Sequence, residues 1–180
     1  MTKLFGPWAL AAVTFAMAPQ VVRAYDIPFQ GSFVVAYSAT LNTRDAAYCG
    51  GSALPVSVEA HGDGFSTLGA LSFSLQKTLG GGLLHGCLTL STPEGDSLTA
   101  IYDGTEGAAN ANNFVVQAGG TLTFTGGTGR FNGATGTAKF TAVFDNFYPG
   151  SSFAGGSGST PLQGVAFYLV IGKVSLSWLG

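Results

Sequence analysis

Apolar side chains recur at every second position along most of this chain, and this period constrains the fold more than any other feature. Leu71, Phe73 and Leu75 alternate with polar residues, and Leu122 and Phe124 stand between threonines. A period of two puts alternate side chains on opposite faces of an extended strand, whereas a helix requires a period near 3.6. After residue 24 no segment shows a convincing amphipathic helix, so the sequence predicts an all-β protein.

The alternating segments predict about eight strands separated by turn residues. The expected strands span residues 29–40, 54–60, 65–76, 84–91, 96–103, 113–125, 136–145 and 164–178, the sixth with a break at Gly119-Gly120. His61-Gly62-Asp63-Gly64 is predicted to be a turn, and a change of apolar phase at Gly172 predicts a bulge or bend. Short antiparallel strands in one domain indicate a barrel or a sandwich. We favour an eight-stranded antiparallel, calycin-like β-barrel, whose interior is filled by side chains or holds one small ligand.

The first residues are typical of a secretory signal peptide. A lysine precedes the uncharged, mostly apolar run of residues 4–18, and Val22-Arg23-Ala24 resembles a cleavage site. We therefore expect residues 1–24 to be a signal peptide and residues 25–180 a single barrel domain that is secreted or periplasmic. The alternative is an uncleaved anchor, although the run is short for a membrane span of about 20 residues.

Charge and cysteine content limit the classes of binding partner, metal and cofactor that we expect. Residues 25–180 hold five basic and nine acidic residues, a formal net charge of −4, with no basic patch. Nucleic acid is therefore a poor partner, and so is a membrane once the signal is cleaved. Cys49 and Cys87 are expected to form a disulfide in an oxidising compartment. A metal or redox site at His85 and Cys87 is the alternative, but further ligands are missing, so we predict no metal and no cofactor.

The segment from Phe124 to Phe140 is unusually rich in glycine. Its turn residues are Gly126, Gly127, Thr128, Gly129, Arg130, Phe131, Gly133 and Gly136. A dinucleotide-binding loop would need a third glycine where Asn132 stands and a helix after it, but a strand is expected there. We therefore predict a tight structural turn, with Phe131 folding inward as a plug and Arg130 in solvent.

The string G-G-T-G-R-F-N-G-A-T-G-T-A resembles motifs of dirigent proteins and allene oxide cyclases, and resembles secreted bacterial proteins of the same barrel type more closely. The sharp match covers about 13 residues. The resemblance implies an eight-stranded barrel, commonly assembled as a trimer, so a homo-oligomer (dimer or trimer) is expected. Asn132 and Thr135 replace the two arginines of the dirigent motif, and Asn132 also replaces the cyclase glutamate. The charged groups of both families are therefore missing, and neither activity is carried over.

Candidate chemical groups are few. Glu59 and His61 are candidates for acid–base catalysis, with a solvated strand face and a surface turn as the alternatives. Tyr37, Tyr102 and Tyr168 share their faces with apolar neighbours and are candidates for ligand binding or for the core. Three functions remain open: a barrel that binds a small apolar molecule, a cyclase or isomerase on the same barrel, and a non-catalytic structural or surface-interaction protein.

Overall fold

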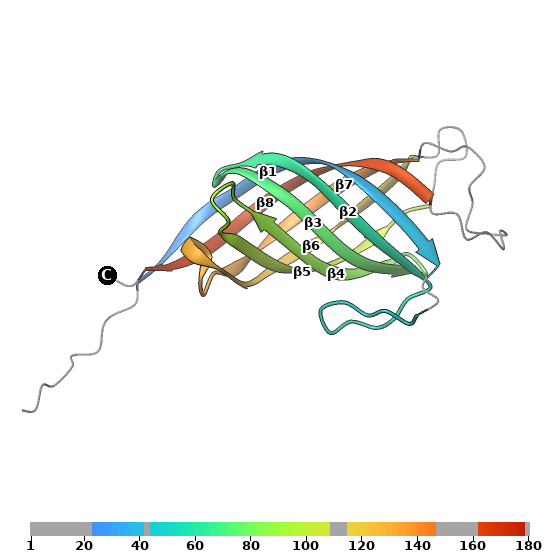
Figure 1. Cartoon of the computed structure of the whole chain (residues 1–180), viewed down its shortest axis with the longest axis horizontal. Coiled ribbons are helices and arrows are strands. Elements are labelled where there is room, and N and C mark those ends of the chain that lie inside the picture. Colours follow the sequence, from blue (N-terminus) through green and yellow to red (C-terminus); the bar gives the residue numbers. More distant parts are fainter. Residues whose placement is uncertain (1–22, 42–43, 109–114, 147–161, 179–180) are drawn as a thin grey trace, which may run out of the picture.

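The computed structural model confirms an all-β fold with one closed eight-stranded antiparallel barrel (Figure 1). It describes residues 23–41, 44–108, 115–146 and 162–178. The strands are β1 (Arg23–Leu41), β2 (Val56–Ser66), β3 (Gly69–Gly80), β4 (Leu83–Ser91), β5 (Ser97–Glu106), β6 (Val116–Gly127), β7 (Thr135–Asn146) and β8 (Leu162–Trp178). Each pairs with the next along the chain, and β1 pairs with β8 to close the barrel.

The inward face carries the core. The alternation of the sequence places one apolar set inside, for example Phe33, Val35 and Tyr37 of β1, all nearly inaccessible to solvent. The closed barrel has two ends. The "disulfide end" holds the end of β1, the β3–β4 hairpin and the loop with Cys49. The "motif end" holds the β2–β3 and β4–β5 hairpins and the glycine-rich β6–β7 turn.

The predicted turn at His61-Gly62-Asp63-Gly64 is wrong, because these residues lie inside β2. A Cβ on Gly62 would stand 2.1 Å from the carbonyl oxygen of Val34, and one on Gly64 would stand 2.5 Å from the ring of Phe33. The glycines therefore let β1 approach closely and let an aromatic ring cover β2. The chain reverses after Ser66 instead.

The predicted bulge at Gly172 is also wrong. β8 pairs in continuous register with β1 and β7 through this position, because Val170 and Val174 both face inward. The apolar residues that suggested a change of phase, Phe167, Leu169 and Ile171, are about half exposed on the outer face. The register shift lies instead between Thr99 and Ala100 in the pairing of β5 with β6. β6 itself runs through the predicted break at Gly119-Gly120.

The glycine-rich segment turns the chain from β6 to β7 around a short 3-10 helix, Gly129–Phe131. Gly126, Gly129, Gly133 and Gly136 have positive φ values, which glycine adopts at little cost. Phe131 is fully buried, and Arg130 donates a hydrogen bond from Nη2 to the carbonyl oxygen of Leu68 at 3.0 Å. The turn therefore closes the motif end and is tied to the β2–β3 hairpin.

The predicted signal peptide lies mostly outside the described residues. β1 begins at Arg23 and pairs with β8 from its first residue, so the pairs formed by Arg23 and Ala24 precede the predicted cleavage point. Tyr25, the first residue of the predicted mature chain, pairs with Leu176.

Candidate functional site

An aromatic cluster fills the barrel interior towards the disulfide end. Tyr102 and Phe140 stack with ring centroids 4.2 Å apart, and Tyr168 meets both rings at 6.4 and 6.2 Å. Phe144 lies edge-on to Tyr168 at 5.8 Å and to Tyr37 at 5.5 Å. Side chains from β1, β5, β7 and β8 therefore converge on one apolar centre. Their rings adopt the offset and edge-to-face arrangements that aromatic pairs prefer.

Lys77 is the unexpected member of this interior. It follows Leu71, Phe73 and Leu75 on the inward face of β3 and is 1% exposed. Its Nζ lies 4.4 Å from the ring centroid of Phe144 and 5.4 Å from that of Tyr102. A Cβ on Gly86, which pairs with Lys77, would stand 2.5 Å from the lysine Cβ, so the glycine makes room for the side chain.

Three buried polar atoms of this interior lack a hydrogen-bond partner among the described residues. They are Nζ of Lys77 and the hydroxyl oxygens of Tyr102 and Tyr168. The two hydroxyls are near enough to influence each other's pKa, but the geometry between them is not that of a hydrogen bond. Buried polar groups in folded proteins are nearly always paired, so three such atoms in one cluster require an explanation.

Glu106 is the acidic counterpart of Lys77. It ends β5 on the same inward parity as Tyr102 and is half-buried. Burial lowers the pKa of Lys77 to about 8, and the charge of Glu106 only partly opposes this shift. Burial raises the pKa of Glu106, opposed in part by the charge of Lys77. The two groups therefore influence each other, but they form no ion pair within the described structure.

The interior tyrosines are held neutral. Burial, together with the charges of Asp145 and Glu106, raises the pKa of Tyr37 to about 12. Burial also raises the pKa of Tyr102 and Tyr168 well above the usual value. At neutral pH these phenols are donors and acceptors of hydrogen bonds rather than anions.

The predicted site residues divide between the two faces of the barrel. Tyr37, Tyr102 and Tyr168 all lie inside, in the aromatic cluster. Glu59 and His61 lie on the outward face of β2 and are exposed, so the structure does not bring them to the tyrosines. Their catalytic role stays a prediction, and the interior acid and base are instead Glu106 and Lys77.

Sequence reasoning missed Lys77 and Glu106, although a signal for both was present. Lys77 stands two residues after Leu75 in an inward apolar row, and Glu106 continues the row of Leu98, Ala100 and Tyr102. A charge at the end of an apolar parity on a barrel strand indicates a group that points inside. Without that comparison, each residue is only one of several charged residues scattered along the sequence.

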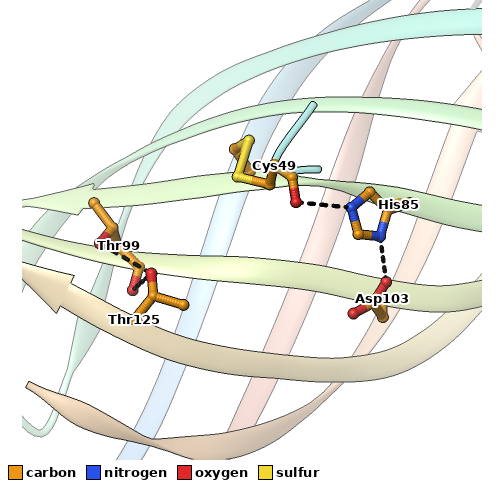
Figure 2. Close-up of a disulfide and its surroundings, with 6 residues drawn as sticks. Cys49, His85, Thr99, Asp103 and Thr125 are labelled. Carbon is orange, nitrogen blue, oxygen red and sulfur yellow. Dashed lines mark hydrogen bonds and ion pairs between the residues drawn. A yellow bond between two sulfur atoms is a disulfide. The ribbon is translucent and has the colours of Figure 1, made fainter. Parts of the chain in front are cut away.

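The outer face at the disulfide end is a structural anchor. Cys49 and Cys87 form a disulfide with Cα atoms 5.5 Å apart, joining the loop after β1 to β4. Figure 2 shows His85 between the Cys49 carbonyl oxygen, 3.4 Å from Nε2, and Asp103, whose Oδ1 lies 2.5 Å from Nδ1. The same close-up includes the contact of Thr99 with Thr125 on β5 and β6, with their hydroxyl oxygens 3.3 Å apart.

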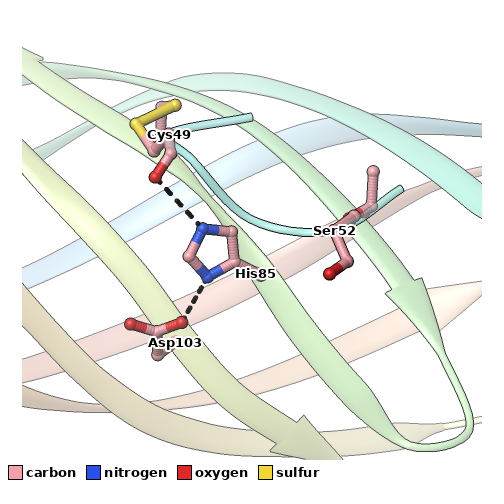
Figure 3. Close-up of polar contacts among 6 residues, drawn as sticks. Cys49, Ser52, His85 and Asp103 are labelled. Carbon is pink, nitrogen blue, oxygen red and sulfur yellow. Dashed lines mark hydrogen bonds and ion pairs between the residues drawn. A yellow bond between two sulfur atoms is a disulfide. The ribbon is translucent and has the colours of Figure 1, made fainter. Parts of the chain in front are cut away.

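The same loop has a further attachment near Ser52, whose carbonyl accepts a hydrogen bond from the buried Thr78 hydroxyl at 3.2 Å. Figure 3 shows Ser52 on the loop beside His85. The disulfide, His85 and Thr78 therefore fasten one loop to the outside of the barrel. In the described part of the chain, no group of three or more histidine, cysteine or acidic side chains is placed to hold a metal ion.

A groove of about 740 Å³ lies towards the motif end of the barrel. Its lining is mostly apolar and includes outward residues, such as Phe65 and Phe167, as well as inward residues, such as Phe33 and Leu71. Tyr168 is the residue that belongs to both the groove and the aromatic cluster. The groove therefore borders the interior cluster without containing Lys77.

Comparison with known proteins adds little beyond this geometry. No protein-family model matches the chain, and no curated protein matches its sequence. Among solved structures, that of a dirigent protein, the pterocarpan synthase GePTS1, aligns with a TM-score of 0.39 and 13% sequence identity, over 91% of this chain and 90% of that chain. Over the residues described, no helix is long and apolar enough to cross a membrane. The barrel is thus established by its own strand pairing.

Proposed function

We propose that this protein is a secreted or periplasmic barrel that binds a small, largely apolar molecule inside the barrel, against the aromatic cluster. The observation that carries the proposal is the set of three unpartnered buried polar atoms, on Lys77, Tyr102 and Tyr168. A ligand with one oxygen acceptor would pair these atoms and leave its apolar part against the aromatic rings. Binding sites commonly combine such an apolar lining with a few convergent polar groups.

Two further features support the proposal. Tyr168 also lines the groove at the motif end, so this mostly apolar groove reaches the edge of the cluster. The disulfide suits an oxidising compartment, in agreement with the apolar leader of the sequence. The homo-oligomer implied by the family resemblance remains a prediction.

Matched tyrosine variants test the proposal. A panel of small aromatic and aliphatic compounds, each with one oxygen acceptor, is screened by the shift in melting temperature of the disulfide-intact protein. Tyr102→Phe and Tyr168→Phe remove hydroxyls that have no partner, so we expect both variants to fold. We also expect them to bind a hit about tenfold more weakly, since one hydrogen bond is lost.

The matched control is Tyr25→Phe, which removes a hydroxyl from a tyrosine that is half exposed on β1. It should bind the hit as the wild type does. The proposal fails if no compound shifts the melting temperature, or if all three phenylalanine variants bind a hit equally well.

A cyclase or isomerase is the second candidate, because the interior holds an acid and a base. Burial moves the pKa of Lys77 down and that of Glu106 up, and desolvation shifts of this kind are common among catalytic acids and bases. Catalysis predicts that Glu106→Gln abolishes conversion of a bound compound and leaves its binding intact. Conversion that persists in this variant excludes the role of Glu106.

A further inference from the structure

The amine of Lys77 has the surroundings of a nucleophile rather than of a structural cation. It is buried at Nζ, packs on two aromatic rings and has no hydrogen-bond partner among the described residues. A structural lysine in a core is normally satisfied by a carboxylate or by carbonyl groups. Desolvation without a partner instead favours the neutral amine, whose lone pair is the reactive form.

The neighbouring groups supply what a carbonyl reaction requires. Glu106 is half-buried on the inward parity of β5 and interacts electrostatically with Lys77. The Tyr102 hydroxyl is also unpartnered, on a ring that Nζ faces at 5.4 Å from the centroid. A carbonyl oxygen accepts hydrogen bonds from phenols, and a carboxyl group whose pKa is raised keeps its proton to a higher pH than usual and can then donate it.

We propose that Lys77 forms a reversible imine with a small apolar aldehyde or ketone that enters the barrel interior. This inference rests on the proposed function, namely that the interior admits a small apolar molecule. It adds the chemical class of that molecule, a carbonyl compound, and a covalent step at a named atom. Lys77 lies on β3, outside the glycine-rich turn that carries the family resemblance, so the proposal does not depend on that resemblance.

The condensation balances without any further reagent. The neutral Nζ attacks the carbonyl carbon, the C–N bond forms as the π electron pair moves to oxygen, and one amine proton passes to that oxygen to give a carbinolamine. Glu106, in its acid form, then protonates the hydroxyl group. The C–O bond breaks, water leaves, and the nitrogen lone pair completes the C=N bond. The iminium cation is balanced by the Glu106 carboxylate, and addition of water reverses the sequence.

The protonation state of the Lys77 amine near neutral pH is compatible with imine formation. With the pKa of Lys77 lowered to about 8, roughly a quarter of the amine is neutral at pH 7.5. The groups that face the amine are Glu106 and Tyr102 of β5 and Phe144 of β7, with Tyr168 of β8 and Tyr37 of β1 beyond them. The tyrosines stay neutral because burial raises their pKa.

Reductive trapping tests the inference directly. The disulfide-intact protein is incubated with benzaldehyde and sodium cyanoborohydride at pH 7.5, and the modified lysine is located by peptide mass mapping. We expect saturable modification of Lys77, at least tenfold faster than that of Lys139 and Lys173, which are exposed and serve as internal controls. Lys77→Arg, which keeps a cation, should remove the fast modification, and Glu106→Gln should slow it about tenfold.

Benzyl alcohol separates this inference from the proposed function, because it has the same ring and cannot form an imine. If benzaldehyde and benzyl alcohol both shift the melting temperature but Lys77 is not modified faster than the exposed lysines, imine formation is overturned and interior binding stands. If neither compound binds and Lys77 is not trapped, both are overturned. Fast trapping that persists in Lys77→Arg assigns the reaction to another lysine and also overturns the inference.

Discussion

Nζ of Lys77 lies 4.4 Å from the ring centroid of Phe144 and 5.4 Å from that of Tyr102, inside the barrel. A cation held over an aromatic face gains about 2 kcal/mol when it is desolvated. This gain does not offset the loss of hydration, because burial is the dominant cause of the lowered pKa of Lys77. The barrel therefore retains a residue that costs it stability, which is typical of a functional site.

The pH dependence of unfolding should reveal this cost. Because the pKa of Lys77 is lowered from 10.5 to about 8 on folding, the unfolded chain binds more protons between these values, and stability rises with pH. We expect the free energy of unfolding to increase by about 2 kcal/mol from pH 7 to pH 9.5. The interior tyrosines, whose pKa is raised by burial, oppose this trend as the phenols of the unfolded chain begin to ionise towards pH 10.

Lys77→Met is the matched variant for this measurement, since it keeps the length of the side chain and removes the charge. We expect it to be more stable than the wild type at pH 7 and to lose the rise towards pH 9.5. Urea unfolding followed by circular dichroism at both pH values measures this. If the free energy of unfolding depends on pH in the same way in the wild type and in Lys77→Met, then folding does not lower the pKa of Lys77.

The sequence predicted the barrel more fully than the site. Period-two alternation located all eight strands, because a sheet with one buried face imposes that period on its residues. A turn was wrongly predicted at Gly62, where a glycine instead lets the backbone of β1 lie close to β2. A bulge was wrongly predicted at Gly172, because apolar residues such as Phe167 face solvent on β8. Alternation along β3 and β5 places Lys77 and Glu106 on the inward rows of their strands. It does not encode that the two groups interact, because this depends on which strands face each other across the interior.

Gly62→Ala tests the reassigned segment of β2. The new Cβ would stand 2.1 Å from the Val34 carbonyl oxygen and 2.6 Å from the Val35 Cα, so the backbone of β1 must shift. Overpacking of this kind costs about 1–3 kcal/mol, and chemical denaturation should show that loss. Asp63→Ala, at the exposed position beside it, should change stability by less than about 0.5 kcal/mol. If the two variants are equally stable, Gly62 does not lie close to β1, and the original prediction of a turn is favoured.

Phe131→Ala tests the plug of the motif end. The ring is fully buried and belongs to the core, so its removal should lower the free energy of unfolding by about 3–5 kcal/mol. Asn132→Ala, at the exposed neighbouring position, is the control and should have little effect on the urea midpoint. A loss below about 1 kcal/mol for Phe131→Ala would contradict a packed turn.

The disulfide should stabilise the domain through the unfolded state. Cys49 and Cys87 are separated by 38 residues, and closing such a loop is worth about 4 kcal/mol in the chain-entropy model. The double variant Cys49→Ala/Cys87→Ala should lose about that amount in urea unfolding. Dithiothreitol should destabilise the wild type to a similar extent and leave the double variant unchanged. A reducing agent that affects both proteins equally would argue against this bond.

The most direct test of interior binding is a native mass spectrum of the disulfide-intact protein, purified from the cells that naturally make it. We expect one small molecule to be retained per chain, to be released on unfolding, and to be absent from a preparation of Tyr102→Phe/Tyr168→Phe. The same spectrum counts the subunits. A bare chain that also gains no mass in the presence of the apolar panel would contradict the account, and the barrel would then be a packed structural domain.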